Sequence, residues 1–172
     1  FRAMAQHRLP NWGDLDLGDA PEDDALEVIM RSVRWSATPH PLTVTLGNLQ
    51  PGAAYKAQLI FGSPMQRDQD WEHEPLRGQR GFDIFVDGVR VLKGFEPLIA
   101  AKYNPRTQLT TGAYVKFIFE AKPAETPSTV SEVAIVLRGS AGEFVDTNPS
   151  LHGFTLEYVS PARDGRRRRA LQ

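Results

Sequence analysis

Apolar and polar residues alternate with a period of two through most of the chain after residue 42. The pattern recurs in segments at residues 42–46, 55–61, 82–86, 89–92, 114–119, 133–137 and 154–158. In a strand this period places every second side chain on the same face, so each segment is predicted to form a half-buried antiparallel strand. The dipeptide Asp87-Gly88, which separates two of the segments, is a strong signal for a two-residue hairpin turn.

The segments that separate the strands are rich in turn-forming residues. Residues 62–81 and 121–131 are polar and contain prolines, which predicts loops, and a loop as long as the first is usually functional or disordered. Residues 98–111 form a connection that could include a short strand. Residues 25–31 could form a short helix, with Asp24 as its N-cap, or a strand. Because no segment predicts a long amphipathic helix, the pattern indicates an all-β fold, an antiparallel β-sandwich or jelly roll.

The composition is that of one globular domain without a large charge surplus. The 172 residues are 41% hydrophobic and 24% charged, with 20 basic and 21 acidic side chains. A net charge of −1 argues against a dedicated nucleic-acid-binding protein, because phosphate contacts need a basic surplus. No apolar stretch approaches the ~20 residues of a membrane span. The absence of cysteine excludes disulfides, cysteine metal sites and thiol nucleophiles.

Charged residues concentrate in two segments. Residues 14–27 contain seven acids, which could supply oxygen ligands to a structural Ca²⁺, but their spacing differs from that of an EF-hand loop. We favour the alternative, in which these acids belong to a solvated loop and to the start of a helix, where acids are common. The run from Arg166 to Arg169 could be a protease target, a localisation signal, a contact for a polyanion or the end of a linker.

These patterns divide the chain into three parts. Residues 1–24 are expected to be irregular and to pack on or flank the domain, and residues 25–159 to form the sandwich. Residues 160–172 are expected to be a disordered basic tail. The chain begins with Phe1 and has no signal-peptide pattern, so we expect a domain that is part of a larger polypeptide.

The tryptophans are the first candidates for ligand contacts. Trp12, Trp35 and Trp71 lie in predicted loops or at strand edges, with polar residues on both sides. Sugar binding needs flat apolar faces for C–H groups, and loop tryptophans supply them. The alternative is that each indole packs in the core, because tryptophan is usually well buried. No serine-hydrolase elbow, zinc-protease motif or phosphate loop is present, so no catalytic or metal-binding residue is assigned.

The order of three stretches resembles the malectin and malectin-like family. The run from Arg31 to Trp35, followed by the strand from Tyr55 to Phe61, is similar to the family's arginine–x–aromatic motif and the strand after it. The run from Arg80 to Leu92 is similar to its F-D-V-x-V-N-G-x-x-V strand and hairpin. The run from Asp146 to Leu156 is similar to its closing D-N-P-x-x-x-G-I-x-I strand. The resemblance covers roughly residues 25–159.

Membership of this family would imply a galactose-binding-like β-sandwich with one or two short helices, which binds carbohydrate or protein without catalysis. The family's sugar site uses aromatic rings and an acid on loops at one end of the sandwich. Position by position, the resemblance assigns the aromatic after the arginine to Trp35 and the acid to Asp146. It also places Trp12 in the N-terminal loop of the site, and it lets Trp71 replace an aromatic pair that this chain lacks.

The sequence therefore predicts a non-catalytic carbohydrate-binding module of a larger secreted or cell-surface protein, in an extracellular or lumenal location. The predicted ligand-binding residues are those just assigned and their polar neighbours: Trp12, Trp35, Asp70, Trp71, Asp146 and Asn148. The ligand would stack on Trp35 and Trp71, and Asp146 and Asp70 would bind its hydroxyl groups. The alternative is a protein-interaction module on the same fold, in which residues 62–81 dock on a partner and the tryptophans act as hot spots.

Overall fold

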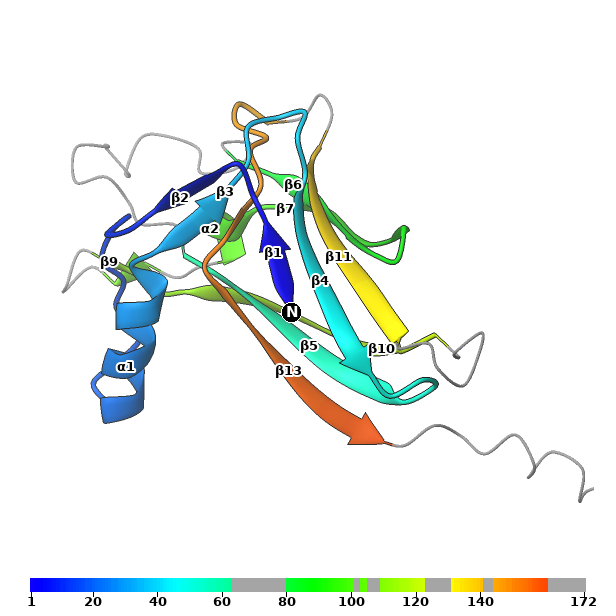
Figure 1. Ribbon diagram of the computed structural model, residues 1–172. Coiled ribbons are helices and arrows are strands. Elements are labelled where there is room, and N and C mark those ends of the chain that lie inside the picture. The colour runs from blue at the N-terminus through cyan, green and yellow to red at the C-terminus, as the bar shows by residue number, and fades with distance from the viewer. Residues whose placement is uncertain (63–79, 101–102, 105–108, 123–130, 141–143, 161–172) are drawn as a thin grey trace, which may run out of the picture.

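The computed structural model describes residues 1–62, 80–100, 103–104, 109–122, 131–140 and 144–160 (Figure 1). It contains the following helices and strands, in chain order: β1 (Arg2–Met4), β2 (His7–Leu9), α1 (Pro21–Met30), β3 (Val33–Trp35), β4 (Leu42–Leu49), β5 (Ala54–Phe61), β6 (Phe82–Val86), β7 (Val89–Phe95), α2 (Pro97–Ala100), β8 (Tyr103–Asn104), β9 (Leu109–Thr110), β10 (Ala113–Glu120), β11 (Ser131–Gly139), β12 (Ser150–Leu151) and β13 (Gly153–Ser160).

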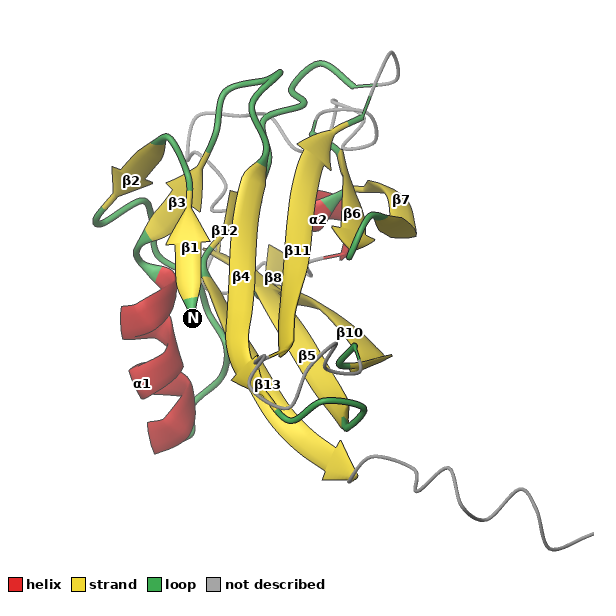
Figure 2. Ribbon diagram, turned by 45° about the vertical axis from the view of Figure 1, so that its right-hand side comes forward, coloured by secondary structure: helices red, strands yellow, loops and turns green. Residues whose placement is uncertain are grey.

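Two antiparallel sheets pack face to face to form a β-sandwich (Figures 1 and 2). The first has the strand order β1-β4-β11-β6-β7, and the second has the order β10-β5-β13. The period-two alternation explains the packing: every second side chain is buried along all of β5 and along β4 from Leu42 to Leu46. The buried side chains of the two sheets form one core, in which the ring of Phe61 in the second sheet lies 5.7 Å from that of Phe82 in the first. The predicted all-β sandwich with one or two short helices is confirmed.

The structure differs from the sequence prediction mainly in short elements. The segment at residues 1–24, expected to be irregular, contributes two strands, β1 and β2, which pair with β4 and β3. Strands of two or three residues are too short for a period of two to be recognised. Helix α1 begins at Pro21, four residues before the predicted start, so the assignment of Asp24 as the N-cap is wrong. Proline at the first helical position explains this start, because its fixed φ suits a helix and its missing N–H is not needed there.

A third, three-stranded sheet covers the end of the sandwich where the loops meet. Its order is β12-β3-β2, and β3 lies in the middle, so that Trp35 faces Ser150 on one side and His7 on the other. This sheet is built from segments more than 100 residues apart in the chain. It connects directly to β13, since β12 ends at Leu151 and β13 begins at Gly153.

Candidate functional site

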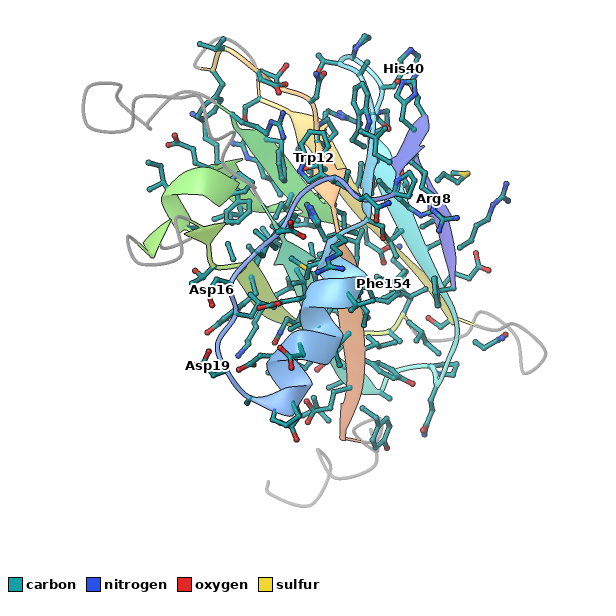
Figure 3. All side chains as sticks on the ribbon, turned by 90° about the vertical axis from the view of Figure 1, so that its left-hand side faces the viewer. Arg8, Trp12, Asp16, Asp19, His40 and Phe154 are labelled. Carbon is teal, nitrogen blue, oxygen red and sulfur yellow. The ribbon has the colours of Figure 1, made fainter. Side chains whose placement is uncertain are left out.

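A pocket of about 130 Å³ lies at this end of the sandwich. Its lining comes from the third sheet, the segment after β2, the segment before β12 and the segment before β6: Leu9, Trp12, Val33, Trp35, Arg80, Asn148 and Ser150. Figure 3 shows Trp12 above α1, in the segment that leads from β2 to the helix. Two tryptophans that are 23 positions apart in the sequence therefore share one pocket.

Trp35 is held by its place in the third sheet. His7 lies directly opposite Trp35 on β2. The imidazole of His7 stacks on the indole of Trp35, with ring centroids 4.3 Å apart and an interplanar angle of 27°. Such a stack fixes the side chain at little further entropic cost, because the two backbones are already paired. His7 covers part of Trp35, and the remainder of the indole lines the pocket.

Trp12 is held through its backbone and by a cation. Its N–H donates to the carbonyl of Arg31, just after α1, and the guanidinium of Arg80 lies 6.0 Å from the ring centroid, a cation–π contact at the limit of its range. The indole nitrogens of Trp12 and Trp35 are both buried, and neither has a hydrogen-bond partner within the described ranges. A buried unpaired donor costs roughly 1–3 kcal/mol, so a ligand oxygen that reached these groups would recover free energy.

An ion pair fixes Arg80 beside the pocket. The Asp146 Oδ2 atom accepts hydrogen bonds from Arg80 Nε at 2.8 Å and lies 2.5 Å from Arg80 Nη2, and both side chains are 28% exposed. The other carboxylate oxygen accepts the backbone N–H of Asn148 at 2.8 Å. Asn148 in turn accepts the N–H of Thr38 through its own Oδ1. Asp146 therefore positions Arg80 and the Asn148 backbone, and both its oxygens are already engaged.

A histidine lies behind this cluster. The Nδ1 atom of His152, between β12 and β13, accepts the backbone N–H of Gly62, and its Nε2 is buried without a partner in the described part of the chain. Burial, together with the positive charge of Arg80, lowers the pKa of His152 to about 4. At neutral pH the ring is therefore uncharged, and its hydrogen bond with Gly62 holds the backbone just after the end of β5.

The structure brings three of the six predicted site residues, Trp12, Trp35 and Asn148, around one pocket, with Asp146 next to it. Asp70 and Trp71 lie outside the described residues. For all six, contact with a ligand stays a prediction. Sequence reasoning did not include Arg80, because an arginine before a strand carries no local signal until its partner, 66 residues later, is known.

Several acids of residues 14–27 have structural partners. Asp14 pairs with Arg31 at 3.2 Å, Asp23 accepts the N–H of Ala20 at the start of α1, and Glu27 accepts the N–H of Leu17. Within the described ranges no group of three or more histidine, aspartate or glutamate side chains is placed to hold a metal ion. The same part of the chain has no helix with the length and apolar character needed to cross a membrane.

Comparison with known proteins gives structural matches only: no family model and no curated protein matches the sequence. The ectodomain of ANX2 from Arabidopsis thaliana superposes with a TM-score of 0.65 at 14% identity, over 91% of this chain and 42% of its own. The extracellular domain of ANXUR1 from the same plant gives 0.58 at 12% identity, over 95% and 43%. A structure of the plant peptide RALF23 in complex with FER and LLG2 gives 0.52 at 11%, over 87% and 42%.

These matches establish the fold. The chain spans about two-fifths of the length of the chains it matches. The ANX2 and ANXUR1 structures are extracellular domains of the malectin-like type. The chain therefore has the fold of the malectin-like extracellular domains, as the resemblance in its sequence predicted.

Proposed function

We propose that this chain is a non-catalytic binding module of a larger extracellular protein and that it binds carbohydrate at the pocket between Trp12 and Trp35. The observation that carries the proposal is the convergence of two indoles from separate segments on one concave site. A role in binding is also consistent with the receptor ectodomains that share the fold.

The polar groups around the pocket suit the oxygen atoms of a sugar. The indole N–H groups of Trp12 and Trp35 are donors without a partner among the residues that the structure describes, and the side-chain amide of Asn148 offers a third donor because its oxygen already accepts the Thr38 N–H. Hydroxyl and ring oxygens can accept from all three. The pocket is smaller than the roughly 300–1,000 Å³ of sites that enclose a drug-sized ligand. One ring would enter, and the rest of a glycan would lie outside.

Titration calorimetry with a panel of neutral and acidic oligosaccharides tests this proposal. We expect one class to bind and Trp35→Ala or Trp12→Ala to weaken its binding at least tenfold. Tyr114→Ala is the matched control, because this aromatic is exposed on the outer face of β10, away from the pocket. Circular dichroism would verify that each variant is folded. If no glycan binds the wild type, or if the tryptophan variants bind as it does, carbohydrate binding at this site is ruled out.

A second candidate is a protein-interaction module in which residues 62–81 dock on a partner. It is favoured by the complex of RALF23 with FER and LLG2, since a protein with this fold is seen there with a peptide and another protein. Almost all of this loop lies outside the described residues. Binding of a protein partner that persists at a saturating concentration of the sugar, and that is lost when the loop is shortened, would favour this candidate.

A further inference from the structure

The sandwich is open along one side, between the edges of its two sheets. An edge groove of about 260 Å³, distinct from the pocket, lies there between β1 and β4 on one wall and β13 on the other. Its lining is apolar, apart from one glycine: Phe1, Leu46, Gly47, Phe154 and Leu156. Further along β13, two side chains that face inward remain exposed, 38% for Leu156 and 49% for Tyr158. On the neighbouring strand β5, inward-facing Leu59 is 0% exposed.

The groove exists because the two edge strands differ in length. Strand β1 pairs with only three residues of β4, from Thr43 to Thr45, whereas β13 runs for eight residues along β5. β13 is the outer strand of its sheet, so half of its backbone N–H and C=O groups point away from β5. Figures 1 and 2 show β1 and β13 on the same side of the sandwich.

β13 lacks most features that keep edge strands from pairing. Such strands are usually protected by lysine, proline, an inward-pointing charge or a central bulge. Residues 153–160 contain neither lysine nor proline, and their register with β5 shifts only between Tyr158 and Ser160. The one charged side chain, Glu157, is opposite Lys56 and forms an ion pair with it on the outer face of the sheet.

Two arginines lie at the Gly153 end of this edge. In the third sheet Leu151, Arg34 and Arg8 form one row across β12, β3 and β2. Both arginines are exposed, and in the part of the chain that the structure describes neither has an ion pair with an acid. Like charges directly opposite each other on paired strands repel, so an anion between them would be attracted by both. Figure 3 shows Arg8 and Phe154 on the same side of the molecule.

We propose that the free edge of β13 accepts an extended segment of a protein partner as an added strand. Alternate apolar side chains of the segment would fill the edge groove against Phe154 and Leu156, and acidic residues would lie between Arg8 and Arg34. All ladders between named strands of the structure are antiparallel, and we infer the same for the added strand. Its acidic residues then stand at its C-terminal end. Strand addition supplies affinity through the main chain and specificity through alternate side chains.

Panning a random peptide library on the chain, and in parallel on an Arg8→Glu/Arg34→Glu variant, tests whether the two arginines select acidic residues in the partner. We expect the wild type to enrich peptides that alternate apolar residues and end in acids, and the variant to lose them at least tenfold. A single charge reversal, Lys116→Glu on the outer face of β10, is the control for charge placed elsewhere and should keep them. No enrichment, or enriched peptides without acids or insensitive to the double variant, would overturn the proposal.

The enriched peptide, synthesised in two forms, tests the added strand itself. One form carries N-methyl groups on its odd-numbered amides and the other on its even-numbered amides. Only one set of amides faces β13 in a strand, so one form should lose binding and the other should keep it; equal losses, or none, would refute strand addition. Light scattering that finds a dimer of this chain, broken by Leu156→Glu, would also refute it, since a second copy would then occupy the edge.

Discussion

The pocket between Trp12 and Trp35 and the edge groove lie on the same sandwich but are constructed in opposite ways. The pocket collects side chains from distant segments and fixes them with a stacked ring, an ion pair and side-chain-to-backbone hydrogen bonds. The edge groove is left by the difference in length between β1 and β13, and its lining is apolar apart from Gly47. A preformed pocket suits a small ligand that fits it, whereas an open edge suits a segment that brings its own backbone donors and acceptors.

The largest expected difference between the closed core and the open edge is in the free energy of unfolding, and it is seen by comparing two leucines on neighbouring strands of one sheet. Leu59→Ala should reduce the free energy of unfolding by roughly 2–5 kcal/mol, because Leu59 is fully buried and its removal leaves a cavity. Leu156→Ala should cost only about 1 kcal/mol, because Leu156 already faces solvent. Urea denaturation measures both. Equal losses would mean that the groove is closed in solution and that Leu156 is buried as deeply as Leu59.

The next effect concerns pH and the pocket side of the fold. His152 has a pKa of about 4 in the folded chain against 6.5 when unfolded, so between these values the unfolded state binds the extra proton. Stability is therefore full above pH 6.5 and falls as the pH is lowered toward 4, by up to about 3 kcal/mol. His152→Asn retains an acceptor for the Gly62 N–H but cannot titrate.

Urea denaturation at pH 7 and pH 4.5 checks this expectation. The wild type should lose 2–3 kcal/mol more than His152→Asn between the two values, within the roughly 3 kcal/mol bound. Exposed His40 supplies the control, since His40→Asn should follow the wild type at both. Parallel losses in wild type and His152→Asn would show that this ring is not the buried, uncharged group that the structure describes.

A smaller effect is expected for the Arg80–Asp146 ion pair, which should contribute more to ligand binding at the pocket than to the stability of the fold. A double-mutant cycle of Arg80→Gln and Asp146→Asn should give a coupling free energy of about 1 kcal/mol, since the pair is partly exposed and screened by solvent. Both single variants should weaken ligand binding, because Arg80→Gln removes the guanidinium from the pocket and Asp146→Asn removes the carboxylate that holds it there. A coupling near zero, with binding unchanged, would mean that the ion pair does not organise the site.

The sequence predicted those parts of the molecule that depend on local patterns. Long strands such as β5 keep a period of two for eight residues, and the Asp87-Gly88 turn lies between β6 and β7 as expected. The convergence of Trp12 and Trp35 depends instead on the pairing of β2 with β3. Strands of three residues are too short for their sequence to predict this pairing. The edge groove depends on β1 being shorter than β13. The alternating pattern predicts that Tyr158 faces inward, but it does not predict that no described strand of the other sheet packs over it. Contacts between distant segments were therefore the part that sequence reasoning could not supply.

The smallest effect belongs to the outer face of β13, opposite the groove. Lys56 and Glu157 form an ion pair there, but their side chains are 38% and 59% exposed, so solvent and salt screen the attraction. A double-mutant cycle of Lys56→Gln and Glu157→Gln should give a coupling of no more than about 0.5 kcal/mol that vanishes at high salt. Binding of a strand-forming peptide to the free edge should be unchanged in both variants. A loss of that binding would mean that the added strand is recognised through the outer face of the sheet, because the groove side chains are untouched in these variants.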